Sequence, residues 1–224
     1  MSAKQSGSYF YPSSRILIFG REPVLGQVKS RLEPELGAEG CLALYREMLS
    51  RILGTLRDSN LAPLELWVSS NPTHKLFLTY CNKKDIYLQK GKNLGKKMAY
   101  AVSKSLSSGE VDGLVIVGSD CPAMKEGYVA DALYFLYRKR NKVDVVIGPA
   151  LDGGYVLIAL KRPHVRIFQD IEWGTGRVME QTLARIAAGG LRYKLLEPLW
   201  DVDGPEDLKR LESVDPRLNF QLSV

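Results

Sequence analysis

The chain has 224 residues, of which 45% are apolar and 25% charged, and it carries a net charge of +6. Its lysines and arginines are dispersed and accompany no zinc-ligand spacing or aromatic RNA-binding signature, so an anionic small molecule is favoured over nucleic acid as the partner. Three distant cysteines and the lack of a long apolar stretch argue against a disulfide framework, a secretion signal and a membrane span, and predict a reduced, cytoplasmic protein.

Short apolar runs alternate with amphipathic helical patterns along the chain. Strands are predicted at residues 15–20, 64–69, 85–89, 113–119, 144–149 and 155–160. Helices are predicted over residues 38–56, 93–106, 126–137 and 175–188, and a further one opens at Pro205. This alternation predicts a three-layer α/β/α sandwich with a mostly parallel sheet.

The last two predicted strands are joined by too few residues for a crossover helix, so one of them should run antiparallel and make the sheet mixed. The length suits one domain with a full hydrophobic core. We therefore expect a single domain over residues 15–214, preceded by a flexible segment (1–14) and followed by a C-terminal tail (215–224).

The loop after the first strand is rich in glycine and cations. It contains Gly20, Arg21, Gly26, Lys29 and Arg31. Many nucleotide-using enzymes hold a phosphate chain in such a loop, through fixed positive charge and close backbone approach. The loop matches neither the dinucleotide-binding nor the Walker pattern, so a merely solvated basic loop remains an alternative.

Acidic residues follow two later strands. Asp120 lies in Gly-Ser-Asp-Cys-Pro, and either faces a ligand or caps the next segment. Asp152 precedes Gly153 and Gly154 in a turn that lets the backbone approach a ligand, although two glycines are also ordinary hairpin chemistry. Cys121 is interpreted as a small packed residue rather than a nucleophile.

Asp201 and Asp203 end an apolar stretch just before the last helix. On an extended backbone, residues i and i+2 point the same way, so the two carboxylates can present oxygen ligands to Mg²⁺ or Mn²⁺. The alternative is that Asp203 only caps the helix. Haloacid-dehalogenase phosphatases also begin with Asp-x-Asp-Gly, but they need a long α/β domain after the motif, and only a short segment follows here.

Taken in order, these segments resemble the GT-A-type nucleotide-diphospho-sugar transferase superfamily. The resemblance is strongest to bacterial selenodomain-associated or arsenosugar-biosynthesis glycosyltransferases. Its motifs lie at residues 21–32, 89–98, 118–122, 148–155, 173–175 and 201–208. Leu25, Gly174 and Gly204 depart from the family pattern, which has Pro, Ser and Thr there.

The resemblance implies a role for each motif. Phosphate and nucleotide would be bound by Arg21, Gly26, Lys29, Arg31, Gln89, Gly91 and Gly95. A divalent metal, Mg²⁺ or Mn²⁺, would be bound by Asp120 and Asp203, with Asp201 as a further candidate. The sugar or acceptor would face Asp152, Gly153, Gly154, Tyr155, Trp173 and Thr175.

We therefore predict a metal-dependent transferase that moves the sugar of a nucleoside diphosphate-sugar to an acceptor hydroxyl, with Asp120 and Asp152 as catalytic residues and Asp152 as the base. The alternatives are a nucleotidyltransferase that releases pyrophosphate and a nucleotide-binding module without turnover. The expected partners are a nucleotide or nucleotide-sugar and a small-molecule acceptor, without nucleic acid or membrane; an oligomer is possible.

Overall fold

The computed structural model of the protein describes residues 8–107, 109–140 and 142–214. Its strands are β1 (Ser14–Gly20), β2 (Leu64–Val68), β3 (Ile86–Leu88), β4 (Gly113–Gly118), β5 (Val145–Pro149), β6 (Tyr155–Leu160) and β7 (Tyr193–Leu195). Its helices are α1 (Glu33–Asp58), α2 (Lys75–Tyr80), α3 (Leu94–Leu106), α4 (Glu126–Tyr137), α5 (Val178–Ala188) and α6 (Pro205–Val214). Short 3₁₀ turns occupy Ser30–Leu32, Lys83–Asp85 and Val165–Phe168.

The seven strands form one mixed sheet in the order β3-β2-β1-β4-β6-β5-β7. Strand β6 pairs antiparallel with both of its neighbours, β4 and β5, whereas the other pairs are parallel. This confirms the predicted mixed sheet and identifies β6 as the reversed strand. The beginning of β6 therefore lies at the same edge as the carboxyl ends of β4 and β5.

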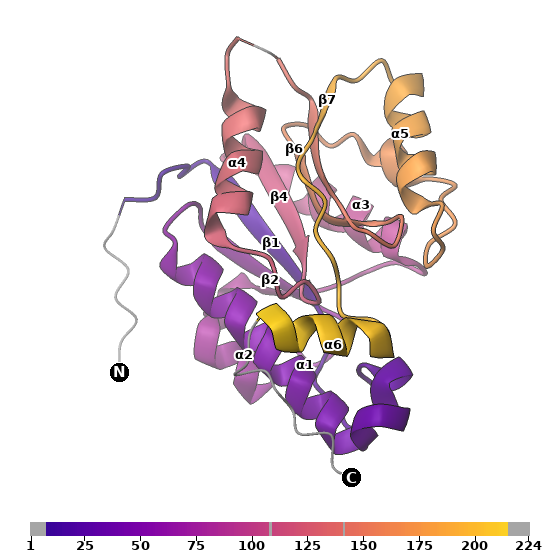
Figure 1. Ribbon diagram of the computed structural model, residues 1–224. Helices are drawn as coiled ribbons and strands as arrows, with labels where there is room; N and C mark the ends of the chain where they lie inside the picture. The colour runs from indigo at the N-terminus through magenta and orange to yellow at the C-terminus, as the bar shows by residue number, and fades with distance from the viewer. Residues whose placement is uncertain (1–7, 108, 141, 215–224) are drawn as a thin grey trace.

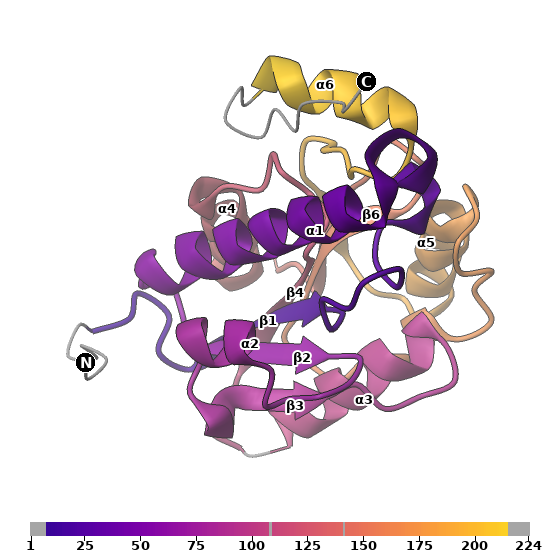
Figure 2. The ribbon, with the colours of Figure 1, turned by 90° about the horizontal axis from the view of Figure 1, so that it is seen from below.

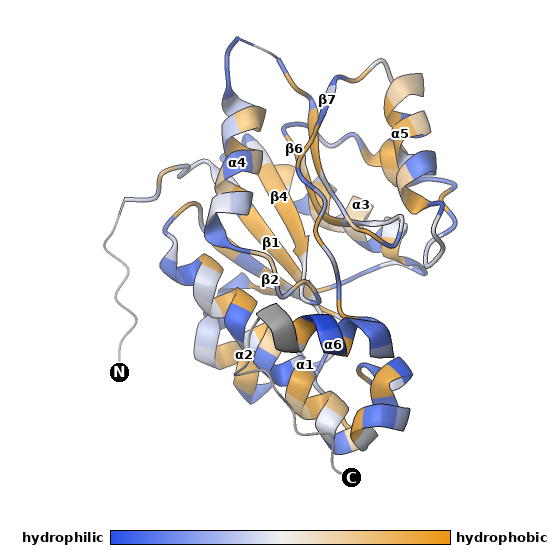
Figure 3. Ribbon diagram, in the orientation of Figure 1, coloured by the Kyte–Doolittle hydropathy of each residue, from blue (hydrophilic) through white to orange (hydrophobic). Residues whose placement is uncertain are grey.

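Helices cover both faces of the sheet (Figures 1 and 2). Along β1, Ile16 and Ile18 pack in one cluster with α1, α2 and α4, while Leu17 and Phe19 pack in another with α3 and α5. This alternation follows from the two-residue period of a strand. Figure 3 shows the resulting apolar band through the central strands.

Helix α1 has a break at Gly37, whose φ of +63° is outside the helical region. The buried stripe starts at Cys41, after this break, which explains why the apolar pattern predicted a helix only from residue 38. Helix α3 begins as predicted, because the Asn93 side chain accepts the N–H of Lys96. Helix α5 begins at Val178, later than the predicted residue 175.

The last helix, α6, packs across α1 rather than on the sheet (Figures 1 and 2). Trp200, Val202 and Leu211 form a third buried cluster with Leu44 and Met48 of α1. This packing holds the acidic segment 201–203 against the main body of the domain.

The described part of the N-terminal segment differs from the flexible segment we expected. The N–H groups of Phe10 and Tyr11 bond to the carbonyls of Asn60 and Leu61, and the Tyr11 ring stacks on Tyr137. Residues 1–7 and the predicted tail at 215–224 lie outside the described residues. Among the described helices, none combines the length and apolar character that crossing a bilayer requires.

Candidate active site

The candidate site lies at the point of the sheet where the order of the strands reverses. From β1 the chain continues to β2 on one side, while β4 pairs with β1 on the other. Loops leaving the carboxyl ends of such a strand pair diverge and leave a crevice, which is where open α/β sheets bind ligands. A cavity of about 540 Å³ opens at this edge, lined by residues from the loops after β1 and β4, from the β5–β6 turn, from residues 173–178 and from the segment before α6.

The basic loop, residues 20–32, forms one wall of the cavity. Its start is anchored by Tyr45 of α1, whose hydroxyl accepts the Arg21 N–H at 2.6 Å and donates to the Arg21 carbonyl at 3.1 Å. Arg21 and Arg31 line the cavity and are exposed. No hydrogen bond or ion pair engages either guanidinium group within the described part of the chain, so both can receive an anion.

Lys29, the third cation of this loop, is buried instead. Its side chain is only 5% exposed, and its ammonium lies 2.7 Å from Asp120 Oδ1 and 3.9 Å from Asp203 Oδ1. The ammonium also donates to the Val202 carbonyl at 2.6 Å. Lys29, Asp120 and Asp203, three predicted site residues from distant parts of the sequence, thus form one cluster.

Four carboxylates, those of Asp120, Asp152, Asp201 and Asp203, line the same cavity as the basic loop. Burial, together with the nearby carboxylates of Asp120, Asp152 and Asp203, raises the pKa of Asp201 to about 7. Burial is the larger cause of this shift, and the neighbouring carboxylates add to it. Arg21, Lys29 and Arg31 supply the opposite charge, so the cavity lining contains both cations and carboxylates.

The segment before α6 is not a regular strand. It makes a single bridge between Leu199 and Ala150 and a hydrogen bond from Val202 N–H to the Asp120 carbonyl. The predicted alternation is nevertheless confirmed, because Val202 is fully buried while Asp201 and Asp203 line the cavity.

The capping alternatives for Asp203 and Asp120 do not hold. At the start of α6, Asp207 Oδ2 accepts the N–H groups of Asp203 and Gly204, both at 2.9 Å. Helix α4 has Lys125, not Asp120, at its N-cap position. Both carboxylates therefore line the cavity and pair with Lys29 instead of capping a helix.

The β5–β6 turn, residues 150–154, places Asp152 at the cavity rim. Asp152 Oδ1 accepts the N–H of Gly154 at 2.8 Å, which closes the turn. Gly153 has a φ of +87° and packs so tightly that an added Cβ would lie 2.2 Å from the Gly176 carbonyl oxygen. Gly153 also accepts the N–H of Met179, in the first turn of α5, so this turn and the 173–178 loop are fixed to each other.

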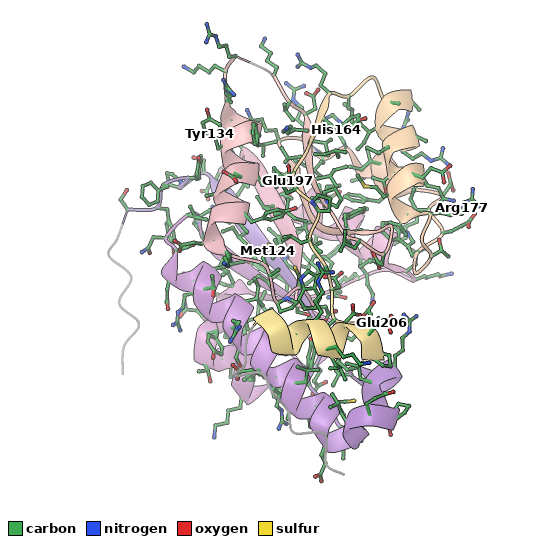
Figure 4. All side chains as sticks on the ribbon, viewed as in Figure 1. Met124, Tyr134, His164, Arg177, Glu197 and Glu206 are labelled. Carbon is green, nitrogen blue, oxygen red and sulfur yellow. The ribbon has the colours of Figure 1, made fainter. Side chains whose placement is uncertain are left out.

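Tyr155, Trp173 and Thr175 all line the cavity, and their contact with a sugar or acceptor stays a prediction. The rings of Tyr155 and Trp173 meet edge to face, with centroids 6.2 Å apart. The Tyr155 hydroxyl is buried beside Thr182 without a hydrogen bond of good geometry, and burial raises its pKa. Only the ring of Tyr155 is therefore available to a ligand. Arg177, in the same loop, projects outward and pairs with Glu172 (Figure 4).

Four predicted nucleotide-binding residues do not line this cavity: Gly26, Gln89, Gly91 and Gly95. The Gln89 amide donates to the carbonyls of Gly20 and Trp67, which ties the basic loop to β2. Gly95 lets α3 approach the 168–173 segment, because an added Cβ would lie 2.6 Å from Trp173 Nε1. These two residues support the cavity wall from behind, and their direct contact with nucleotide stays a prediction.

Sequence reasoning assigned no role in the site to two residues of the cavity lining, Tyr45 and Leu94. Tyr45 belongs to the buried stripe of α1, and Leu94 opens α3, yet both line the cavity. Tyr45 is buried, and its hydroxyl reaches the site through two hydrogen bonds with the backbone of Arg21, which no spacing rule encodes. Cys121 is packed as predicted, since burial raises the pKa of its thiol to about 12.

Asp120 and Asp203 have the chemistry of ligands for a hard divalent cation. Among the described residues, buried Asp120 Oδ1 receives no hydrogen bond of good geometry, and the Lys29 ammonium lies 2.7 Å from it. Among the described residues, no three histidine, cysteine or acidic side chains already form a metal cage. Mg²⁺ commonly binds one or two carboxylates together with substrate phosphates, so two aspartates beside a phosphate-sized cavity fit that mode.

The class of protein follows from this fold and its site. The fold is that of the GT-A-like nucleotide-diphospho-sugar transferase superfamily, and its cavity lies at the switch point of the sheet. Residues 52–175 match the family DUF2064, described as an uncharacterized protein conserved in bacteria, and the chain belongs to this family. No curated protein matches the chain in sequence.

Solved structures give the same class. A protein from Desulfovibrio desulfuricans G20, described as a "putative nucleotide-diphospho-sugar transferase", is 30% identical with a TM-score of 0.82 over 95% of this chain and 92% of that chain. The 4-diphosphocytidyl-2C-methyl-D-erythritol synthase of Anaerococcus prevotii DSM 20548 is 10% identical, with a TM-score of 0.60 over 91% and 96% of the two chains. A CMP:2-keto-3-deoxy-manno-octonic acid synthetase, solved with CTP, is 10% identical, with a TM-score of 0.59 over 92% and 99%. The last two likenesses concern the fold alone.

Proposed function

We propose that the protein is a metal-dependent transferase that binds a nucleoside diphosphate-sugar and moves the sugar to an acceptor hydroxyl. The observation that carries the proposal is the cavity in which Arg21, Lys29 and Arg31 face four aspartates at the carboxyl edge of the sheet. A diphosphate needs cations, and a divalent metal needs carboxylates. The 30% identical protein described as a nucleotide-diphospho-sugar transferase supports the same substrate class.

Each side chain has a role in this proposal. Arg21 and Arg31 bind the phosphates, since their guanidinium groups are exposed in the cavity and can form bidentate contacts with phosphate oxygens. Asp120 and Asp203 would hold the metal, which when bound supplies positive charge against the diphosphate.

Asp152 accepts the proton of the acceptor hydroxyl. One of its oxygens is used by the Gly154 N–H, which fixes the orientation of the carboxylate and leaves the second oxygen for the acceptor. The rings of Trp173 and Tyr155 form the apolar surface on which a sugar can lie, opposite the charged walls.

Nucleotidyl transfer is the second candidate, favoured by the number of cations on the basic loop. Three cations in one loop can bind a triphosphate as well as a diphosphate, and the attack would then fall on the α-phosphorus with pyrophosphate as the leaving group. The two reactions release different products from the same site.

The test is to incubate the protein with Mn²⁺ and a panel of nucleoside diphosphate-sugars, and separately with nucleoside triphosphates and sugar phosphates. Release of nucleoside diphosphate from the first panel supports glycosyl transfer. Release of pyrophosphate from the second supports nucleotidyl transfer. Binding in both panels with release in neither would reduce the protein to a nucleotide-binding module. Asp120→Asn is the matched control, and product formation that persists in this variant would contradict the site assignment.

A further inference from the structure

We propose that Lys29 is an internal counter-ion which occupies the cation position between Asp120 and Asp203 when no ligand is bound, and which is exchanged for the metal when phosphates arrive to receive its ammonium. This inference rests on the proposed function, because it concerns the order in which metal and nucleotide bind to that same site. It predicts that the two ligands bind cooperatively through this one side chain.

The position of the Lys29 ammonium carries the argument. It lies 2.7 Å from Asp120 Oδ1 and 3.9 Å from Asp203 Oδ1, between the two carboxylates that would hold the metal. Its side chain is 5% exposed, so it is more buried than either aspartate. A metal bound to Asp120 through that oxygen would meet a buried positive charge at contact distance, which is strongly unfavourable. Lys29 and the metal therefore exclude each other.

The exchange needs a movement of the Lys29 side chain only. The Lys29 carbonyl accepts hydrogen bonds from the Leu32 N–H at 2.8 Å and the Cys41 thiol at 3.3 Å, which anchor its backbone to the start of α1. Lys29 is also held in the left-handed region, with φ 53° and ψ 32°. A flexible four-carbon stem carries the ammonium from this fixed base.

The cavity offers the ammonium one other class of partner. Arg21 and Arg31, from the same loop, are exposed and line the cavity, so a phosphate bound there brings anionic oxygens to the loop that carries Lys29. Without phosphate, a displaced ammonium would lose both Asp120 and the Val202 carbonyl and gain only water. With phosphate, it gains a new anion, so the nucleotide lowers the free-energy cost of metal entry.

The test compares Mn²⁺ affinity in the full-length protein and two variants by isothermal titration calorimetry. Lys29→Met removes the counter-ion, and Arg31→Met removes the same charge from the exposed rim of the same loop. Without nucleotide, we expect Lys29→Met to bind Mn²⁺ at least about tenfold more tightly than the wild type, and Arg31→Met to change the affinity by less than about threefold. Equal affinities of the two variants, or weaker binding by Lys29→Met, would overturn the inference.

Nucleoside diphosphates added to the same titrations separate this inference from the proposed function. If Mn²⁺ and a nucleoside diphosphate bind in an Asp120-dependent way while Lys29→Met behaves like Arg31→Met, the counter-ion role falls and the proposed function stands. If neither the wild type nor Lys29→Met binds Mn²⁺ under any condition, both fall.

A measurement on the wild type covers the case in which Lys29→Met does not fold. Sulfo-NHS-acetate modifies accessible lysine amines, and peptide mass spectrometry gives the rate at each position. Mn²⁺ alone, at saturating concentration, should raise the rate at Lys29 because it expels the ammonium into the cavity, and should leave exposed Lys96 unchanged. An unchanged or slower rate at Lys29 would contradict the exchange.

Discussion

Gly153→Ala tests whether contact between two main-chain segments fixes the turn that carries Asp152. Gly153 has a φ of +87°, and its added Cβ would lie 2.2 Å from the Gly176 carbonyl oxygen and 2.8 Å from the carbonyl carbon. Both are backbone atoms, so no change of side-chain rotamer can relieve the contact. The Gly153 carbonyl also accepts the Met179 N–H at 2.8 Å, so moving the turn would break a bond to α5.

The expected cost has two parts. A residue other than glycine in the left-handed region costs about 1–2 kcal/mol. Forcing extra atoms into a packed contact costs about 1–3 kcal/mol more. Gly174 separates the two, because it has a similar φ of +84° but no described atom within 4 Å of an added Cβ. Gly174→Ala should therefore lower the free energy of unfolding by the first amount only, and Gly153→Ala should lower it by about 2–5 kcal/mol in all.

Urea unfolding followed by circular dichroism measures both variants against the wild type. We expect a clearly larger loss in the free energy of unfolding for Gly153→Ala than for Gly174→Ala, with similar m-values. Equal losses would refute the reasoning, since the close approach to Gly176 would then contribute nothing.

Three further predictions concern the cap, the thiols and the aromatic wall. Asp207→Ala should lower the free energy of unfolding by about 0.5–2 kcal/mol, because it leaves two N–H groups at the start of α6 uncapped. Glu206→Ala, in the same turn, should lower it by less. Equal unfolding midpoints of the two variants would count against the cap. Burial raises the pKa of Cys81 and Cys121 to about 12, so both thiols are protonated at pH 8. Iodoacetamide should therefore alkylate them far more slowly in the native protein than in urea. Fast labelling of the native protein would contradict their burial. Tyr155→Phe should leave turnover nearly unchanged, because the hydroxyl is buried away from the cavity. Trp173→Ala should reduce turnover, because its ring lines the cavity. A large loss of turnover in Tyr155→Phe would assign the hydroxyl a role in the reaction.

The strands of the central sheet could be predicted because they are buried on both faces. Residues 113–117 and 156–160 are continuous apolar runs in the sequence and are buried throughout in the structure. Strand β7 was missed for the opposite reason, since Tyr193 and Lys194 are exposed at the edge of the sheet and leave no apolar run.

Helix α2 was missed because its start has an unusual cap. The His74 side chain accepts the N–H of Leu76 through Nδ1, and the helix spans only six residues. Such a short helix provides too little periodicity to be recognised. Glu65 shows a related limit: it is buried within β2, where Trp67 and Ser105 donate hydrogen bonds to its carboxylate, and no local pattern reveals these partners.

The sequence could predict which strand ends bring the site residues together, but not which of those residues touch one another. Asp120, Asp152 and Asp203 each follow an apolar run, and the rule that ligands gather at the carboxyl edge brings them together. The insertion of Lys29 between Asp120 and Asp203 depends on a left-handed backbone at Lys29 and on the fold of α6 against α1. Neither is encoded within a few residues of the motifs, so the sequence did not predict that the Lys29 ammonium contacts both aspartates, and its contact with phosphate stays a prediction.

The most direct test of the central claim is a crystal structure of the wild type grown with Mn²⁺ and a nucleoside diphosphate, with data collected at the manganese absorption edge. We expect an anomalous peak within coordination distance of the carboxylates of Asp120 and Asp203, with the diphosphate beside Arg21 and Arg31. A metal peak that neither aspartate coordinates, or a diphosphate bound away from the basic loop, would contradict the account.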